Sequence, residues 1–340
     1  MPRLPERLPA DSMLYSDEST VCTAEGLLPA WFIVTSHGWS ASHWLAYNLA
    51  RHPQIACLHS SAACPADQDE PYDVTDLIAR NDFARVFELV AGFRSGYADR
   101  GTRRPADLYR PMEVQSTARL IGSVHTFRLR DLPAMTVDLS PPDRRLTIVN
   151  LIRHPVNLVN SGAGQFELTF RLDLNELQWV TRRIVDTGLK AFERIAARHK
   201  LYPGDLEVLS FFGACATLQG LAADFTARDR LLAQPSANYA GFVRQEDITR
   251  DPTEFHDLVD RLSCGSVDCP PDYLQAVFAD RRRNTHNSRA LPRAASALFQ
   301  AWLPWQQEAF AFCLDHFGLR PLYEAEGYDL SMVPPGLETA

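Results

Sequence analysis

The chain has 340 residues, of which 46% are hydrophobic and 22% charged, a composition typical of globular proteins. Its formal net charge is -8, which argues against a general affinity for nucleic acid, so an anionic ligand would have to meet a local cluster of cations. The 7 cysteines are scattered, odd in number and without CxxC spacing, which argues against a disulfide framework and a zinc site. We therefore expect free thiols in a reducing compartment.

Residues 1–28 are rich in Pro, Asp and Ser, and we expect them to form a leader that lies over the surface or is partly disordered. They lack the apolar core of a secretory signal, and no apolar run approaches the ~20 residues of a membrane helix. We therefore expect a soluble, cytoplasmic protein without a transmembrane segment and without a nucleic-acid partner. The sequence leaves the oligomeric state open.

The first predicted unit is a strand, a loop and a helix. Residues 30–35 form an apolar, β-rich run, residues 36–42 are SHGWSAS, and the helical periodicity that follows ends at Pro53. In this order of elements, backbone N–H groups and a helix N-terminus can bind a phosphate. The loop is not a Walker A motif, because GxxxxGK[ST] is absent.

The next predicted elements lead to a histidine at the end of a strand. Residues 55–59 predict a second strand, residues 82–93 an amphipathic helix and residues 103–109 a basic loop. Residues 119–125 then predict a buried strand that ends at His125. A lone histidine at a strand end is usually structural or solvated. His125 becomes a candidate because two other possible ligand groups also follow strands.

The stretch 146–162 carries the strongest indication of a ligand site. Its near-continuous apolar run, residues 146–152, is typical of a strand buried on both faces, and Pro155 suits the first turn of a helix. Arg153 follows the end of the strand, and Ser161 comes about two helical turns later. We interpret Arg153 and Ser161 as ligands of a phosphate. The alternative is an arginine in a surface ion pair and a serine without a ligand.

The rest of the chain is mainly helical. An amphipathic segment spans 175–199, and a strand is predicted at 239–246. A helix led by Pro252 follows, and Pro304 should split or kink the helical region at 294–317.

This alternation of strands and helices predicts an α/β protein with a mainly parallel sheet and helices on both faces. Right-handed crossovers would bring Thr35, His125 and Arg153 to one edge of the sheet, where ligands bind in open α/β folds. The arginines at 281–283 are a further candidate. Such a run is usually a solvated surface, but arginine also binds phosphate through a bidentate fork.

Several stretches together resemble sulfotransferases that use 3′-phosphoadenosine 5′-phosphosulfate (PAPS). The likeness spans about residues 30–330 and follows the family's order. In chain order the matching stretches are Ser40-Ala41-Ser42-His43-Trp44 for the 5′-phosphosulfate loop, His125 with Leu132-Pro133 for the THxxxxxLP segment, Arg153-His154-Pro155 with Ser161 for the 3′-phosphate motif, and Val243-Arg244-Gln245-Glu246-Asp247-Ile248 with Asp251-Pro252 for the RYEDL…DP segment. The ending Glu326-Gly327-Tyr328-Asp329-Leu330 also resembles a common family ending.

The resemblance implies a three-layer α/β sandwich with a mainly parallel sheet and a P-loop-like phosphate-binding loop after the first strand. It implies a single domain at 29–330 and a tail at 331–340, with regions 60–118 and 165–240 forming a lid or an acceptor site. The implied activity is transfer of a sulfuryl group from PAPS to a hydroxyl or amine of an unidentified small-molecule, lipid or carbohydrate acceptor. No metal is required.

The family's motifs assign roles to the matching residues of this chain. His125 corresponds to the catalytic base, and Arg153 with Ser161 would hold the 3′-phosphate. His43 is a second catalytic candidate, because it lies at the expected helix N-terminus close to the phosphate. The residues expected to contact the nucleotide are Gly38, Trp39, Ser40, Ala41, Ser42, His43, Trp44, Arg153, Ser161, Arg281, Arg282 and Arg283. The three consecutive arginines stand in for the family's RKGxxGxWK loop, which is absent as written.

The loop departs from the family's [KR]SGTTW pattern. Trp39 occupies the position of the Lys or Arg that contacts the bridging oxygen of the sulfuryl group, Ala41 that of a Gly, and His43 that of a Thr. Either His37, His43 or an arginine from elsewhere replaces the missing charge, or the protein binds PAPS without turnover. We hypothesise that His43 partly compensates. Gln245 replaces the aromatic residue of RYED, so the adenine contacts differ as well.

Three other functions fit parts of the sequence. One is an α/β-hydrolase, in which residues 38–42 would form an imperfect G-x-S-x-G elbow with Ser40 as the nucleophile, although the stretch 153–161 has no place in it. The second is a PAPS-binding protein that has lost catalysis, which Trp39 suggests. The third is a P-loop kinase, which the missing Walker lysine disfavours.

Overall fold

The structure is a computed structural model that describes residues 30–59, 62–63, 72–73, 95–98, 109–112, 118–125, 128–131, 146–170, 184, 190–202, 204–233, 239–279 and 294–336. The leader at 1–28, the predicted helix at 82–93, the basic loop at 103–109, Leu132-Pro133 and the arginines at 281–283 lie outside these residues.

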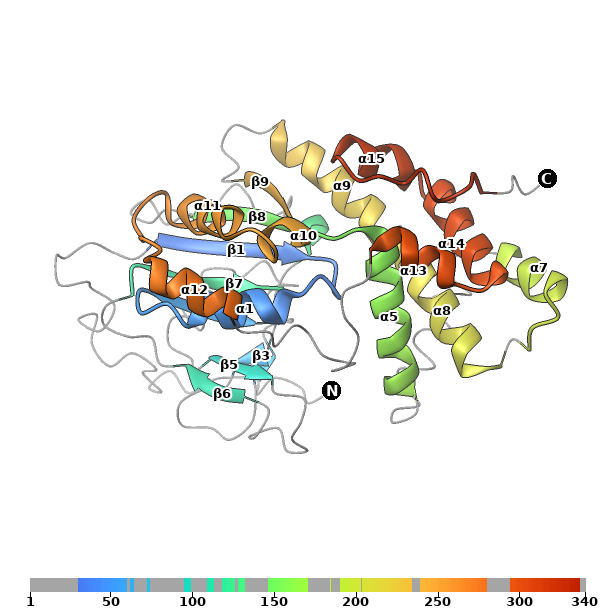
Figure 1. The fold of residues 1–340 in the computed structure, drawn as a ribbon, viewed down its shortest axis with the longest axis horizontal. Coiled ribbons are helices and arrows are strands. Elements are labelled where there is room, and N and C mark those ends of the chain that lie inside the picture. Colours follow the sequence, from blue (N-terminus) through green and yellow to red (C-terminus); the bar gives the residue numbers. More distant parts are fainter. Residues whose placement is uncertain are drawn as a thin grey trace, which may run out of the picture.

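Five strands form one parallel sheet in the described part of the chain (Figure 1). They are β1 (Ala30–Ser36), β2 (Ile55–His59), β7 (Leu120–Val124), β8 (Leu146–Ile152) and β9 (Tyr239–Arg244), in the order β2-β7-β1-β8-β9. The predicted α/β class is therefore confirmed, and each strand lies where the sequence predicted one. Two short antiparallel pairs, which were not predicted, are β3 (Ala62–Ala63) with β4 (Tyr72–Asp73) and β5 (Ser95–Ala98) with β6 (Tyr109–Met112).

The central strands β1 and β8 are apolar because both of their faces are covered. All residues of β8 are buried, as expected of an inner strand in a parallel sheet. The neighbouring β1 buries Phe32 and Ile33 completely. The polar side chains inside these strands satisfy each other, since Thr35 Oγ1 donates a hydrogen bond to Asn150 Oδ1 at 2.9 Å.

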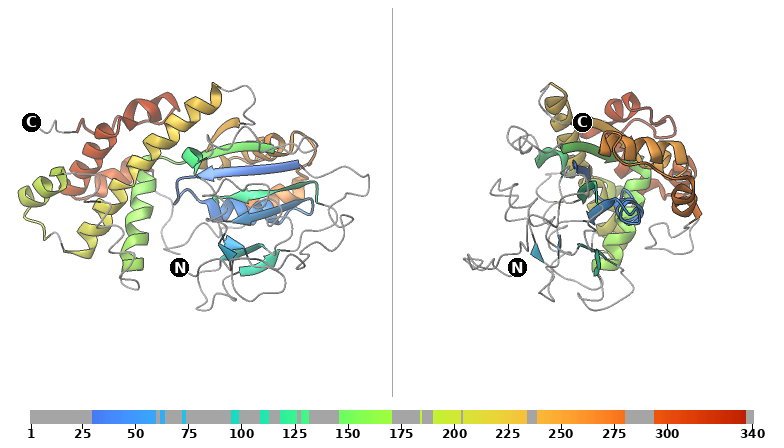
Figure 2. Two further views of the ribbon diagram at one scale, coloured as in Figure 1. Left: turned by 180° about the vertical axis from the view of Figure 1, so that it is seen from behind. Right: turned by 90° about the vertical axis from the view of Figure 1, so that its left-hand side faces the viewer.

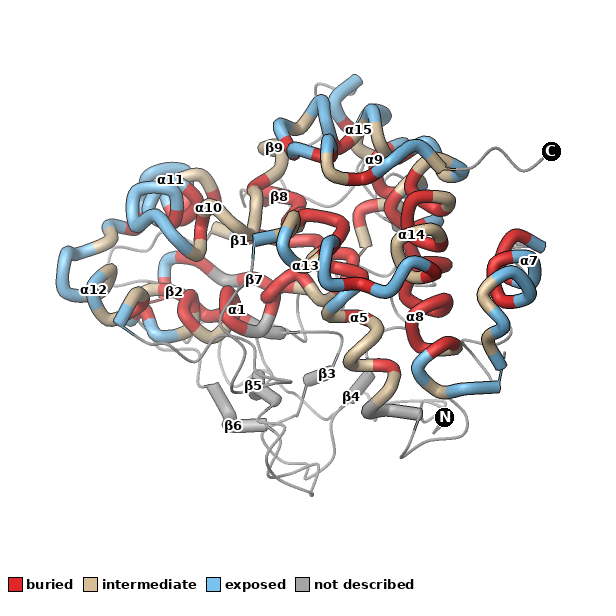
Figure 3. Tube along the Cα trace, turned by 45° about the vertical axis from the view of Figure 1, so that its right-hand side comes forward, coloured by how far each residue is buried: buried red, intermediate tan, exposed pale blue. Residues whose placement is uncertain are grey.

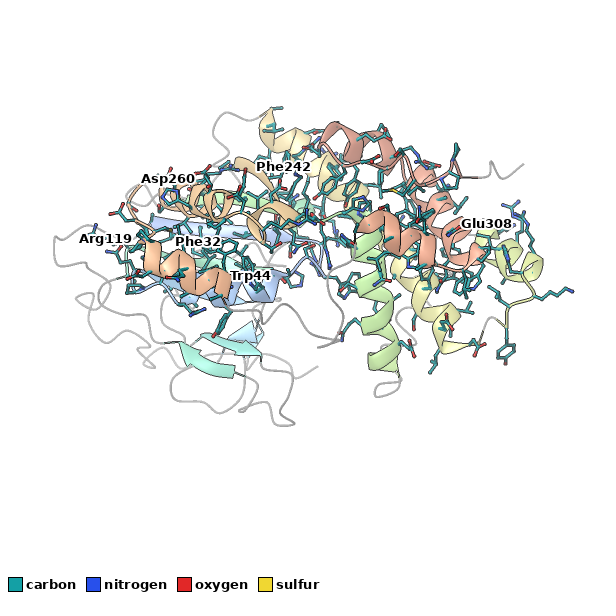
Figure 4. The ribbon with its side chains drawn as sticks, viewed as in Figure 1. Phe32, Trp44, Arg119, Phe242, Asp260 and Glu308 are labelled. Carbon is teal, nitrogen blue, oxygen red and sulfur yellow. The ribbon has the colours of Figure 1, made fainter. Side chains whose placement is uncertain are left out.

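One face of the sheet is covered by α1 (Ser42–Ala50), α11 (Pro252–Ser263) and α12 (Pro271–Ala279). Trp44 is labelled in Figure 4. Its ring packs edge-on against Phe255 and Phe278, with ring centroids 5.7 and 6.3 Å away. The helix α11 begins where predicted because Pro252 occupies its first turn and Asp251 Oδ1 accepts a hydrogen bond from the Thr253 N–H at 2.8 Å.

A second, larger group of helices lies beyond the carboxyl ends of the strands rather than over a face (Figures 1 and 2). Its members are α5 (Pro155–Phe170), α7 (Lys190–Arg198), α8 (Leu206–Ala216), α9 (Leu218–Leu232), α13 (Ala295–Ala301), α14 (Pro304–His316) and α15 (Leu319–Ala325). They share one hydrophobic core, and their outer faces are exposed (Figure 3). The helical region is split near Pro304, as predicted, because α13 ends at Ala301 and α14 begins at Pro304.

The helical segment Leu206–Leu232 is long and apolar enough to cross a membrane by length and composition. The sequence predicts helical structure in this region, but no apolar run in it was expected to approach the length of a membrane helix. Most of its apolar stretch is buried inside the protein, where α8 and α9 pack in the helical core. Core packing therefore accounts for the apolar composition.

The parallel registers bring the ends of three strands together. Val34 of β1 pairs with Val124 of β7, and Ser36 of β1 pairs with Leu151 of β8. His125 and Arg153, which follow β7 and β8, therefore flank the loop that leaves β1. The chain crosses from one side of β1 to the other between β7 and β8, and such a switch point in strand order is where open α/β sheets bind ligands.

Candidate functional site

The loop between β1 and α1 has an unusual backbone. Gly38 has φ 111°, and the non-glycine residues Trp39 and Ala41 have left-handed φ values of 52° and 57°. Such conformations cost energy for residues with a Cβ and are enriched at functional sites. Ala41 is the N-cap of α1, and it supplies no side-chain hydrogen bond to the first turn, which also contains no acidic residue. The helix N-terminus therefore suits an external anion.

Trp39 connects this loop to α5. Its carbonyl oxygen accepts a hydrogen bond from Arg153 Nη1. Its indole packs edge-on against the Phe166 ring, with centroids 5.1 Å apart. The indole also lies over Gly162, where an added Cβ would be 3.0 Å from the ring. The loop proposed for the 5′ group and the helix proposed for the 3′-phosphate are thus in direct contact.

Arg153 is a cation without a carboxylate partner among the described residues. Arg153 is half-buried, and its Nε is buried with no hydrogen-bond partner among the described residues. Burial lowers the pKa of the guanidinium, while the charges of Glu246 and Tyr328 act in the opposite direction. A buried donor without a partner is costly unless a ligand meets it. This geometry favours a bound anion over the surface ion pair.

Glu246 supports the Arg153 segment instead of pairing with the arginine. Its carboxylate accepts hydrogen bonds from the His154 N–H at 3.0 Å, Asn157 Nδ2 at 3.3 Å and the Tyr328 hydroxyl at 3.1 Å. His154 Nε2 lies 3.2 Å from the Asp329 carbonyl oxygen. Three stretches with family resemblance, around residues 153, 246 and 328, therefore form one hydrogen-bonded network.

His125 lies beside the loop in a left-handed conformation with φ 68°. Its Nδ1 is 2.6 Å from Ser36 Oγ and 3.1 Å from Arg128 Nη1, and Arg128 also donates to the Ser36 carbonyl oxygen. A guanidinium can only donate, so Nδ1 must act as an acceptor. We therefore assign neutral His125 with its proton on Nε2.

His37 is buried and faces the helical group. Its Nδ1 lies 3.6 Å from Asp224 Oδ2, and the same carboxylate pairs with Arg130 at 3.3 Å. Burial lowers the pKa of His37 more than Asp224 raises it. His37 is therefore poorly suited to replace the missing loop cation.

The remaining predicted residues have varied placements. Ser40 Oγ donates to the Gly38 carbonyl oxygen at 3.0 Å, which closes the loop on itself and gives no support to a role as a hydrolase nucleophile. Trp44 lies in the first turn of α1, but its ring lies in the core. Ser161 is half-buried on α5 beside Gly162. No hydrogen bond joins Ser161 to Arg153, although the structure describes both.

Two other sets of predicted ligands are placed only in part. His43 lies in the first turn of α1, and its side chain is outside the described part of the structure. Arg281, Arg282 and Arg283 are outside it entirely. Among the described residues, no group of three His, Cys, Asp or Glu side chains could hold a metal ion.

Several residues of the site were not singled out from the sequence. Arg128 falls at an unspecified position of the THxxxxxLP-like stretch, and Asp224 lies in a stretch without a recognisable motif, so neither spacing nor periodicity marks them. Gly162 could have been noticed, because glycine is unfavourable inside a helix and this one directly follows Ser161. Glu246 was part of a matching stretch, but its three hydrogen bonds become evident only when the chain is folded.

Acidification is expected to destabilise the fold through its buried histidines. Burial lowers the pKa of His37, His52 and His154, whereas in the unfolded chain each takes up a proton near pH 6.5. Each buried, neutral histidine therefore stabilises the fold fully above about pH 6.5. This stabilisation is lost as the pH falls through the lower pKa that the histidine has in the folded protein. The melting temperature should drop by a few degrees between pH 7 and pH 5.

The variant His52→Gln provides a test away from the site. His52 Nδ1 accepts the Gln54 N–H at 3.1 Å and Nε2 lies 2.8 Å from the Asp268 carbonyl oxygen, an arrangement that requires the neutral ring. We expect thermal unfolding of this variant to depend less on pH than that of the parent. If the melting temperature of the parent protein stays constant or rises on acidification, the expectation is contradicted.

Comparisons with known proteins give a distant similarity. No model of a known protein family matches the chain, and no curated protein matches it significantly. Among solved structures, the chain is similar to a sulfotransferase from Alicyclobacillus acidocaldarius, with 19% sequence identity, 74% of this chain and 91% of that chain covered, and a TM-score of 0.35.

Proposed function

We propose that this protein is a PAPS-dependent sulfotransferase that transfers a sulfuryl group to a hydroxyl or amine of an acceptor. The observation that supports this most is the contact between Arg153 and the carbonyl oxygen of Trp39. It joins a strained loop and an uncapped helix N-terminus, which suit one anionic group, to a half-buried arginine whose buried Nε no described group uses, which suits a second. A nucleotide with separate 5′ and 3′ anionic groups matches this pair.

The two anionic groups would be held by different means. The 5′-phosphosulfate would lie against the loop 38–41 and the N-terminus of α1, whose N–H groups and dipole stabilise negative charge. The 3′-phosphate would meet Arg153 in the segment between β8 and α5, with Ser161 on α5 as a second donor. The N–H groups at the loop are fixed before the reaction and would stabilise the charge that develops on the leaving phosphate.

His125 is the proposed general base for the acceptor proton. Imidazole is suited to this role near neutral pH. To act through Nε2, the ring must carry its proton on Nδ1, and Ser36 Oγ at 2.6 Å can accept a hydrogen bond from that proton. For Nδ1 to carry this proton, Arg128 has to stop donating its hydrogen bond to that atom.

The first test is nucleotide binding. Adenosine 3′,5′-bisphosphate, the product of the donor, should raise the melting temperature of the purified protein, because a ligand at 100 times its Kd stabilises the native state by about 2.7 kcal/mol. Adenosine, which lacks both phosphates, is the matched control and should give no shift. A folded protein whose melting temperature is unchanged by millimolar bisphosphate would overturn the proposal.

A second candidate function is a nucleotide-binding protein without transferase activity. Trp39 favours it, because the indole packs into α5 and leaves that loop position without a cation. The two functions differ in one measurement, the release of adenosine 3′,5′-bisphosphate from PAPS in the presence of phenol, sugar, sterol and amine acceptors. Binding without release on any acceptor would support this second candidate.

A further inference from the structure

Transfer of a sulfuryl group develops negative charge on the oxygen that joins sulfur to the 5′-phosphate. In this chain the loop position expected to supply a cation there holds Trp39, whose indole is turned into α5. The charge therefore has to come from another part of the chain, and the cations around the loop can be compared directly.

Arg128 lies against the loop from the side of β7. An added Cβ on Gly38 would be 3.8 Å from Arg128 Nη1, 3.9 Å from Nη2 and 3.6 Å from His125 Cε1. The guanidinium also donates to the carbonyl oxygen of Ser36, the last residue of β1. The guanidinium therefore lies between the loop, where the sulfuryl donor would bind, and His125, which would act on the acceptor.

Three other described side chains that can carry a positive charge lie near the loop. Arg130 pairs with Asp224 at 3.3 Å and also donates to the Gly220 carbonyl oxygen at 3.0 Å. Arg153 contacts Trp39 from the β8 side and is the ligand proposed for the 3′-phosphate. The pKa of His37 is lowered by its burial.

We propose that Arg128 supplies the reaction-centre cation that Trp39 lacks, and that binding of the donor to Arg128 releases His125 to act as the base. This rests on the proposed function above. In the structure Arg128 donates to His125 Nδ1, which holds the ring proton on Nε2. When the guanidinium turns to the anionic donor, Nδ1 can carry the proton and donate it to Ser36 Oγ, and Nε2 becomes an acceptor.

The reaction then proceeds as a single in-line displacement. An acceptor oxygen bonds to the sulfur of PAPS while the bond from sulfur to the bridging oxygen breaks. The electron pair of the broken bond stays on the 5′-phosphate, next to Arg128. The acceptor proton passes to His125 Nε2. The products are the sulfated acceptor and adenosine 3′,5′-bisphosphate.

Ligands that lack one phosphate distinguish the contribution of Arg128 to nucleotide binding from that of Arg153. Arg128→Gln is expected to weaken binding of adenosine 3′,5′-bisphosphate roughly 10- to 100-fold in calorimetric titration, as for loss of a charged hydrogen bond. Binding of adenosine 3′-monophosphate should be unchanged, because that ligand has no 5′ group. Arg128→Lys should recover part of the loss, and unchanged melting of the ligand-free variants confirms folding.

The outcomes distinguish the two proposals. If the parent protein binds neither nucleotide, the proposed function fails. If the parent binds the bisphosphate but Arg128→Gln binds both ligands as the parent does, or loses both equally, the role of Arg128 is overturned.

The state of His125 gives an independent readout. In protein labelled with ¹⁵N at histidine, the His125 resonances should show the proton on Nε2 without ligand and on Nδ1 with adenosine 3′,5′-bisphosphate. Adenosine 3′-monophosphate should leave the ring unchanged, and His125→Asn assigns the signal. The same tautomer with and without the bisphosphate would contradict the release of His125 by Arg128.

Discussion

Replacing Arg153 by glutamine is expected to weaken binding of adenosine 3′,5′-bisphosphate by roughly 100-fold or more, the range found when one partner of a buried, hydrogen-bonded charge pair is truncated. The side chain offers a buried Nε that no described group uses, and partial burial lowers the pKa of its guanidinium. An anion at this position therefore gains a charge-assisted hydrogen bond that water does not compete for.

The control for this prediction is a change of ligand rather than of protein. Adenosine 5′-monophosphate lacks the 3′-phosphate, and its affinity should differ little between the parent and Arg153→Gln. Arg51→Gln is a matched variant at the other end of α1, where Arg51 donates to the Ala276 carbonyl oxygen at 3.2 Å. It should bind both nucleotides as the parent does. Undiminished binding of the bisphosphate by Arg153→Gln would remove the main support for the proposed function.

Gly122→Ala is expected to prevent folding. Gly122 lies in β7 opposite Phe32 of β1, and an added Cβ would be 2.1 Å from the Phe32 carbonyl oxygen and 2.5 Å from its ring. The carbonyl belongs to a central strand that cannot move without breaking its own pairing. Overpacking of this kind exceeds the usual 1–3 kcal/mol, and we expect a loss above about 4 kcal/mol.

Gly164→Ala provides the matched control for Gly122→Ala. Gly164 lies in α5, and no atom would come within 4 Å of an added Cβ. Alanine favours a helix over glycine by about 1 kcal/mol, so this variant should unfold at a slightly higher urea concentration than the parent. Soluble yield and urea midpoints measure both effects. A soluble Gly122→Ala protein with a normal midpoint would show that β1 and β7 are not packed as described.

The sheet could be predicted from the sequence because its signals are local. Apolar runs such as residues 146–152 are long enough to mark buried strands, and Pro252 and Pro304 mark the starts of helices. The position of the larger helical group could not be predicted. Amphipathic periodicity shows that a helix has a buried face, but not that α8 and α9 pack beyond the edge of the sheet.

Only those residues of the site that directly follow a strand could be predicted from the sequence. His125 and Arg153 could be proposed because parallel strands end at a common edge. Arg128 could not, since nothing in the sequence shows that a residue three positions after His125 turns back onto Gly38. Asp224 lies far along the chain from His37 and Arg130, and only folding brings the three together. Contacts of this kind depend on tertiary packing rather than on local pattern.

The packing of Trp39 against Gly162 determines which parts of this protein could be exchanged with another. A lysine at position 39 would leave the space beside Gly162 and Phe166 unfilled, and it would add a cation next to Arg128 and Arg153. The loop 37–41 and the helix α5 therefore depend on each other, because the loop's side chain at position 39 fills space beside the helix. In a chimera they would have to be transplanted together, with residue 128 chosen according to the charge that the incoming loop carries.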